Sequence, residues 1–102
     1  MKAEHRYTNS GTVFRDIEEE LRRAVEKFPT WPTDPLHALA VLGEEFGELT
    51  KAMLQLTYEP EKSSKQHVQE EAIQTAAMAI RLVMSLDLYQ YTRTSQHKQG
   101  ER

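Results

Sequence analysis

The chain of 102 residues contains no cysteine. This absence excludes disulfide bonds and thiolate metal sites, and it leaves the redox compartment open. An excess of basic residues is also lacking, because 13 Lys and Arg stand against 16 Asp and Glu, for a formal net charge of −3. Proteins that bind nucleic-acid polymers need a basic stripe to release counterions. We therefore expect no nucleic-acid polymer among the partners of this protein.

Long hydrophobic runs are missing as well. No apolar run approaches the roughly 18–20 residues that span a bilayer, and the opening MKAEHRYTNSGT has no apolar segment of the signal-peptide kind. These absences predict a cytoplasmic protein without a membrane segment. A chain of this length is expected to form one small domain.

Apolar residues at helical spacing predict an all-α fold. The expected helices are residues 13–28, residues 35–57, and a third that starts at a cap on Ser63 or Ser64 and ends at Leu86 or Leu88. PTWPTDP separates the first two, since proline cannot continue a helix, and Asp34 before Pro35 is a typical helix start. Residues 13–88 are the predicted helical domain, with a flexible segment over residues 1–12 and a polar, disordered tail over residues 89–102.

The second and third helices are expected to form an antiparallel hairpin, with the first helix beside it, because a short loop joins them. The expected core stripe of the second helix is Leu39, Leu42, Phe46, Leu49, Met53 and Leu56. From Ala72 onward the third helix (AIQTAAMAIRLVMSL) is apolar almost all round, which is typical of a helix buried on most sides. Three helices cannot enclose one of their own number. We therefore expect a homodimer through the second and third helices, or a dimer of dimers.

The predicted first helix carries its charged residues on the face opposite its apolar residues. Glu18 with Arg22 and Glu19 with Arg23 stand four residues apart in the favourable acid-first order. We interpret this face as solvated and assign it no function.

Acidic residues cluster in the stretch EEFGE of the second helix. Glu45 and Glu48 are three residues apart and project from one side of the helix, whereas Glu44 turns toward solvent. In the third helix, Glu71 and Gln74 repeat the three-residue step. Whether the two steps meet depends on the register of the hairpin, which the pattern does not fix. Ordinary surface acids are the alternative.

A meeting of these carboxylates would favour a cation site. Two like charges about 5 Å apart cost on the order of 3 kcal/mol at an effective dielectric near 20, so a cluster of three takes up protons or binds a metal. Oxygen ligands without cysteine or a histidine pair favour Mg²⁺, or Mn²⁺, over zinc.

With these residues, the sequence resembles the MazG-like all-α nucleoside triphosphate pyrophosphatase superfamily. Members carry E-E-x-x-E on one helix and E-x-x-D on the next, and the four acidic side chains bind Mg²⁺. EEFGE matches the first motif and EAIQ stands at the second, within a likeness that runs roughly from Trp31 to Leu86. The resemblance implies a house-cleaning enzyme that converts a nucleoside triphosphate to the monophosphate and pyrophosphate. It implies catalytic metal ligands at Glu45, Glu48 and Glu71, and a further ligand at Gln74.

Gln74 departs from the family pattern, which has aspartate at this position. Its amide oxygen can coordinate a metal, but it adds no charge, so Mg²⁺ affinity is expected to fall. A degenerate, non-catalytic helical dimer that binds a nucleotide or a protein partner is therefore the alternative function.

Three more residues are candidate substrate contacts. Arg81, two turns beyond Gln74, could pair its planar guanidinium with phosphate oxygens, or it could pair with a glutamate or lie at the end of the dimer interface. Lys51 could meet a phosphate, or it could be an ordinary surface lysine. Trp31 could stack on a nucleobase, or it could pack against Phe28 or a partner subunit.

Overall fold

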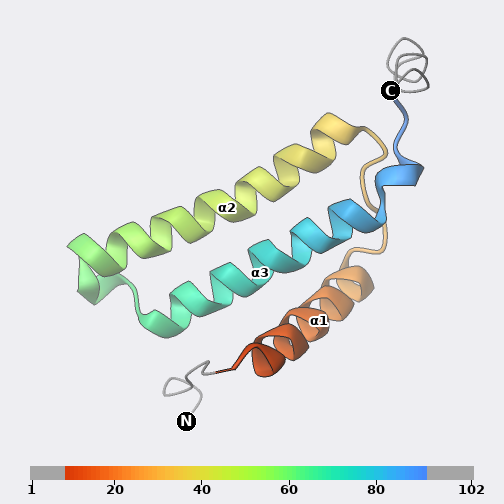
Figure 1. The fold of residues 1–102 in the computed structure, drawn as a ribbon. Helices are drawn as coiled ribbons and strands as arrows, with labels where there is room; N and C mark the ends of the chain where they lie inside the picture. The colour runs from red at the N-terminus through yellow and green to blue at the C-terminus, as the bar shows by residue number, and fades with distance from the viewer. Residues whose placement is uncertain (1–8, 92–102) are drawn as a thin grey trace, which may run out of the picture.

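The computed structural model describes residues 9–91, which form helices and the loops between them (Figure 1). The α-helices are α1 (Ser10–Lys27), α2 (Pro35–Tyr58) and α3 (Lys65–Met84), and the short 3₁₀-helices are η2 (Pro60–Lys62) and η3 (Leu86–Leu88). No strand occurs within residues 9–91. The all-α prediction is therefore confirmed. Residues 1–8 and 92–102, which include most of the two predicted flexible segments, lie outside the described residues.

Each α-helix starts at a side chain that caps its first turn. The caps are Asn9 Oδ1, which accepts the Thr12 N–H (2.9 Å), Asp34 Oδ1, which accepts the Leu36 N–H (2.9 Å), and Ser64 Oγ, which accepts the His67 N–H (3.0 Å). These bonds satisfy N–H groups that have no partner within the helix. The predicted starts at Asp34–Pro35 and at Ser64 are confirmed. α1 starts before the predicted Val13, because Asn9 supplies a cap that apolar spacing does not register.

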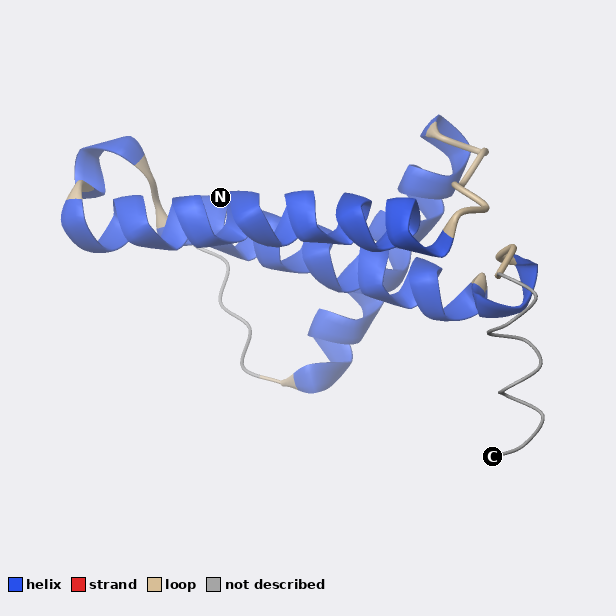
Figure 2. Ribbon diagram, turned by 90° about the horizontal axis from the view of Figure 1, so that it is seen from above, coloured by secondary structure: helices blue, strands red, loops and turns tan. Residues whose placement is uncertain are grey.

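The helices form a hairpin with a third helix laid across it. α2 and α3 run antiparallel and are joined through η2, as predicted (Figure 1). α1 packs against α3, so α3 lies between its two neighbours. Figure 2 shows that α1 crosses the hairpin obliquely instead of lying along it. The molecule measures 51 × 28 × 28 Å.

The core is thin and consists largely of small residues. Its buried apolar members are Ala38, Ala52, Ala77, Met78 and Tyr89. Alanines on the facing sides of α2 and α3 allow the two helix axes to come close, because interaxial distance follows side-chain size at the contact. Among the described residues, no large side chain is fully buried.

The apolar stripe of α2 divides into two rows, so the prediction of one core stripe is wrong for half of it. Leu42, Leu49 and Leu56 are half-buried, whereas Leu39, Phe46 and Met53 are 55%, 59% and 48% exposed. The stripe is wider than one neighbouring helix can cover, and α1 packs on α3. The exposed row has seven-residue spacing, which is typical of a helix seam that meets another helix. We call Leu39, Phe46 and Met53 the outer row.

The loop between α1 and α2 contacts the C-terminal end of α3. The Arg81 Nη2 donates to the main-chain oxygen of Phe28 (2.6 Å), and the Arg81 guanidinium carbon lies 4.8 Å from the centre of the Trp31 ring. Phe28 is the C-cap of α1, where the helix dipole leaves partial negative charge. The buried guanidinium therefore stabilises this helix end and holds the loop against α3.

Tyr89 also contacts Trp31, although the sequence pattern places residue 89 in the predicted polar tail. The Trp31 Nε1 donates to the Tyr89 hydroxyl (2.7 Å), and Tyr89 is only 6% exposed. Next to it, the Gln90 N–H donates to the Thr33 carbonyl (2.8 Å). The folded unit thus continues past the predicted boundary at residue 88. Trp31 and Tyr89 lie 58 residues apart in the chain, so local composition does not reveal their contact.

Replacing Tyr89 with phenylalanine tests this contact. Tyr89→Phe removes the acceptor of the Trp31 Nε1–H, and an unpaired donor at a half-buried site costs about 1 kcal/mol. For a domain of this size, that loss corresponds to a fall in Tm of roughly 4–8 °C, measured by thermal circular dichroism. Tyr91→Phe is the control, because it removes an exposed bond to the Leu86 carbonyl (2.9 Å). Equal shifts in the two variants would contradict the contact's structural role.

Candidate functional site

The register of the hairpin brings the two acidic steps together. The Thr75 hydroxyl of α3 lies 2.8 Å from the Glu71 carbonyl oxygen and 3.2 Å from the Glu45 carbonyl oxygen of α2. Its single proton can be donated to either carbonyl, so the hydroxyl links the two helices at this level. Glu45 therefore faces the turn of α3 that starts at Glu71. The sequence does not single out Thr75, because its cross-helix partner depends on the register.

Carboxylates from all three α-helices influence Glu45. Burial raises the pKa of Glu45 above the ordinary glutamate value, and the charges of Glu71, Glu48, Glu20 and Glu44 raise it further, in that order. Glu45 and Glu71 are half-buried, whereas Glu48 is exposed. The cluster thus has a partly desolvated centre at the α2–α3 contact and an open side.

The donor set of this cluster suits a hard divalent cation. Glu45, Glu48 and Glu71 offer carboxylate oxygens and Gln74 offers an amide oxygen, which are ligands that Mg²⁺ accepts. The raised pKa of Glu45 means that its ionised form is disfavoured, and a nearby cation would relieve that cost. Within residues 9–91, however, no three His, Asp or Glu side chains are arranged as a ready-made metal ligand set. Holding a cation would therefore require these side chains to rotate toward one another.

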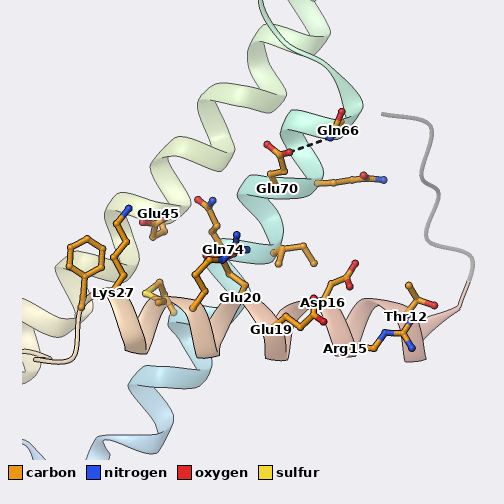
Figure 3. A pocket seen from close by; sticks show the side chains of 16 residues that line it. Thr12, Arg15, Asp16, Glu19, Glu20, Lys27, Glu45, Gln66, Glu70 and Gln74 are labelled. Atoms are coloured by element: carbon orange, nitrogen blue, oxygen red, sulfur yellow. Dashed lines mark hydrogen bonds and ion pairs between the residues drawn. The ribbon is translucent and has the colours of Figure 1, made fainter. Parts of the chain in front are cut away.

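A cavity of about 980 Å³ opens beside Glu45, between α1 and the hairpin (Figure 3). Glu45 reaches it from α2 and Gln74 from α3, and Met78 gives it an apolar side. The volume is at the upper end of the range for small-molecule sites, about 300–1,000 Å³. The cavity is partly open to solvent, so this volume includes space at its mouth.

The charged face of α1 forms the opposite wall of this cavity. The residues of the two predicted pairs are exposed, as the interpretation of a solvated face expects, but Glu19 and Arg23 also border the cavity. Asp16, Glu20, Arg23 and Lys27 line the cavity. The Glu20 side chain is only 16% exposed and forms an ion pair with Arg23, in place of the predicted Glu19–Arg23 pair. A charged helix face that borders a cavity has the same sequence pattern as one that borders water. For this reason, sequence reasoning missed it.

The three candidate substrate contacts lie elsewhere. Arg81 is buried, and burial lowers its pKa; its partners are the Phe28 carbonyl and the Trp31 ring, so it forms no ion pair with a glutamate. Trp31 packs against the Arg81 guanidinium, and Lys51 is exposed on α2. Of the described residues that line the cavity beside Glu45, none is one of these three.

Comparisons of the chain with models of protein families, with curated proteins and with solved structures find no match. Between residues 9 and 91, no helix has both the length and the apolar character that crossing a membrane requires.

The pH dependence of stability tests the electrostatics of Glu45. A raised pKa means that the folded chain holds the proton more tightly than the unfolded chain, so stability falls as the pH rises through the folded-state pKa. Glu45→Gln removes that loss. We expect its Tm at neutral pH, without divalent cations, to exceed the wild-type value by about 2–4 °C, since solvent screening limits the effect to roughly 0.5 kcal/mol.

The difference should vanish well below the ordinary glutamate pKa of 4.5, where Glu45 is protonated in both states. Thermal unfolding followed across this pH range provides the measurement. Glu61→Gln, at an exposed acid in η2, is the control and should leave Tm unchanged. A lower Tm for Glu45→Gln at neutral pH would contradict the proposed repulsion.

Proposed function

We propose that the protein is a Mg²⁺-dependent nucleotide pyrophosphohydrolase, which converts a nucleoside triphosphate to the monophosphate and pyrophosphate. The observation that carries this proposal is the meeting of Glu45 and Glu71 across the α2–α3 contact, beside the cavity between α1 and the hairpin. It agrees with the resemblance of EEFGE and EAIQ to the paired motifs of the MazG-like superfamily. We place the activity in the cytoplasm.

Each residue of the cluster has a distinct part in the proposed reaction. Glu45, Glu48 and Glu71 would hold Mg²⁺ through carboxylate oxygens, and Gln74 would add a neutral amide oxygen or orient a water molecule. When bound, the cation supplies Lewis-acid polarisation of phosphate oxygens and lowers the pKa of a bound water. Met78, on the apolar side of the cavity, would exclude bulk water from one side of the nucleotide.

We further propose that the working form contains two copies of the chain, paired through the outer row of α2 and the neighbouring face of α3. The outer row is about half exposed along its length, and Ile80, Val83 and Met84 of α3 are also exposed. Large exposed apolar side chains in such number are typical of a protein–protein interface. A dimer of dimers is compatible with the same surface.

A non-catalytic role is the second candidate, and two observations favour it. Gln74 contributes no negative charge where the family motif has aspartate, and the described side chains form no ready-made metal ligand set. A helical dimer that binds a nucleotide or a protein partner without hydrolysing it would show both features.

Pyrophosphate release from a panel of standard and modified nucleoside triphosphates, with Mg²⁺ or Mn²⁺, tests the enzymatic proposal. We expect turnover by the wild type and a loss of about 100-fold or more in Glu48→Ala and Glu71→Ala, because each removes a charged metal ligand. Glu61→Ala is the matched control and should retain activity. Absence of turnover above the Glu48→Ala background throughout the panel would remove the enzymatic proposal.

Gln74→Asp, in the same assay, separates the two candidates. A large gain of activity would indicate a decayed site that the aspartate restores, whereas unchanged or lower activity would indicate that glutamine belongs to a working site.

Introducing a charged residue into the outer row tests the proposed dimer. Phe46→Glu places a carboxylate in the middle of the proposed interface, where its desolvation is costly. We expect sedimentation velocity to show a dimer for the wild type and a folded monomer for Phe46→Glu. Phe14→Glu changes an equally exposed aromatic residue on α1 and should remain dimeric. A dimer of unchanged strength in Phe46→Glu would contradict the proposed interface.

A further inference from the structure

We propose that Arg23 and Lys27 of α1 bind the phosphate chain of the substrate, on the cavity wall that faces Glu45 and Gln74. This inference rests on the proposed function, because it takes a polyphosphate as the ligand. It assigns α1, the helix without a family motif, to substrate binding.

The distribution of charge around the cavity is the first observation. Arg15, Glu19, Arg23 and Lys27 are spaced by four residues along α1 and all line the cavity, so they form one continuous row on its wall. The hairpin side offers Glu45, Glu70 and Gln74, and α1 adds Asp16, Glu19 and Glu20 among its basic residues. The lining is therefore acid-rich, and a polyphosphate enters it only together with a cation. A polyphosphate held beside carboxylates through a cation still needs positive charge on its outer oxygens, and the row on α1 supplies it.

Lys27 is the last member of this row, in the final turn of α1. Figure 3 shows its side chain extending from α1 toward the part of the cavity that holds Glu45. The Lys27 Nζ lies 5.5 Å from the centre of the Phe28 ring and forms no ion pair with the described carboxylates. The aromatic face holds the ammonium by a cation–π contact without neutralising it. Its charge is therefore available to an anionic ligand.

Arg23 lies one turn before Lys27, and part of its guanidinium is already in an ion pair. Its Nη2 pairs with Glu20, which leaves other donors of the five that a guanidinium presents. Arginine can hold a carboxylate on one edge and a phosphate on another, because its donors form a planar fork. Glu20 thus orients Arg23 along the cavity wall.

The C-terminal end of a helix carries partial negative charge, which would ordinarily disfavour an anion bound at Lys27. Here the buried Arg81 guanidinium donates to the main-chain oxygen of Phe28 and offsets that charge. Arg81 is then a positioning residue for the phosphate site, which it supports through the helix end and not by contact with the ligand.

Inorganic tripolyphosphate with Mg²⁺, titrated calorimetrically into the full chain, tests the site without requiring turnover. We expect Lys27→Met and Arg23→Gln each to weaken binding by about tenfold, the loss of one charge-assisted contact. Lys27→Arg should restore most of the affinity. Lys62→Met removes the same charge in η2, outside the cavity, and should bind as the wild type does. Because Lys27 is exposed, its variants should keep the wild-type Tm.

Wild-type affinity in both Lys27→Met and Arg23→Gln, or no tripolyphosphate binding by the wild type, would overturn the inference. Parallel pyrophosphate-release assays separate this failure from failure of the proposed function. Hydrolysis with an unchanged KM in Lys27→Met would overturn the phosphate site alone. Binding through Lys27 and Arg23 without hydrolysis of any nucleotide would support the site and remove the enzyme.

Discussion

Repulsion between carboxylates at the contact of α2 and α3 is the constraint on which the site depends. Alanines bring the two helices close, and Thr75 links them at the level where Glu45 faces Glu71. This packing leaves Glu45 partly buried, so its ionised form is disfavoured. A proton or a divalent cation relieves this cost, and the oxygen-only donor set favours a hard cation. The same packing that holds the hairpin together therefore creates the proposed cation site.

The placement of α1 explains two other features of the molecule. Because α1 crosses the hairpin on the α3 side, a cavity opens between its charged face and the acidic cluster (Figure 2, Figure 3). The outer row of α2 remains without a neighbour for the same reason. One wall of the proposed site thus comes from a helix without any motif, while the apolar surface left over is suited to a second copy of the chain.

Features that depend on neighbouring residues were predictable from sequence, and features that depend on distant ones were not. The Asp34 and Ser64 caps and the bounds of α2 follow from local chemistry. The predicted end of α3 at Leu86 or Leu88 was wrong, because the helix ends at Met84 and a separate 3₁₀-turn follows. The division of the α2 stripe required knowledge of which helix packs where. The proximity of Glu45 to Glu71 needed the register, and the Trp31–Tyr89 bond joins residues 58 positions apart. The acidic motifs were therefore visible in the sequence, whereas the cavity beside them was not.

Anomalous diffraction from crystals grown with Mn²⁺ would locate the proposed cation without relying on activity. We expect an anomalous peak between α2 and α3, within coordination distance of Glu45 and Glu71, with Glu48 and Gln74 turned toward it. No peak at this position at saturating Mn²⁺, with these side chains directed into solvent, would contradict the account and leave a helical bundle without a metal centre.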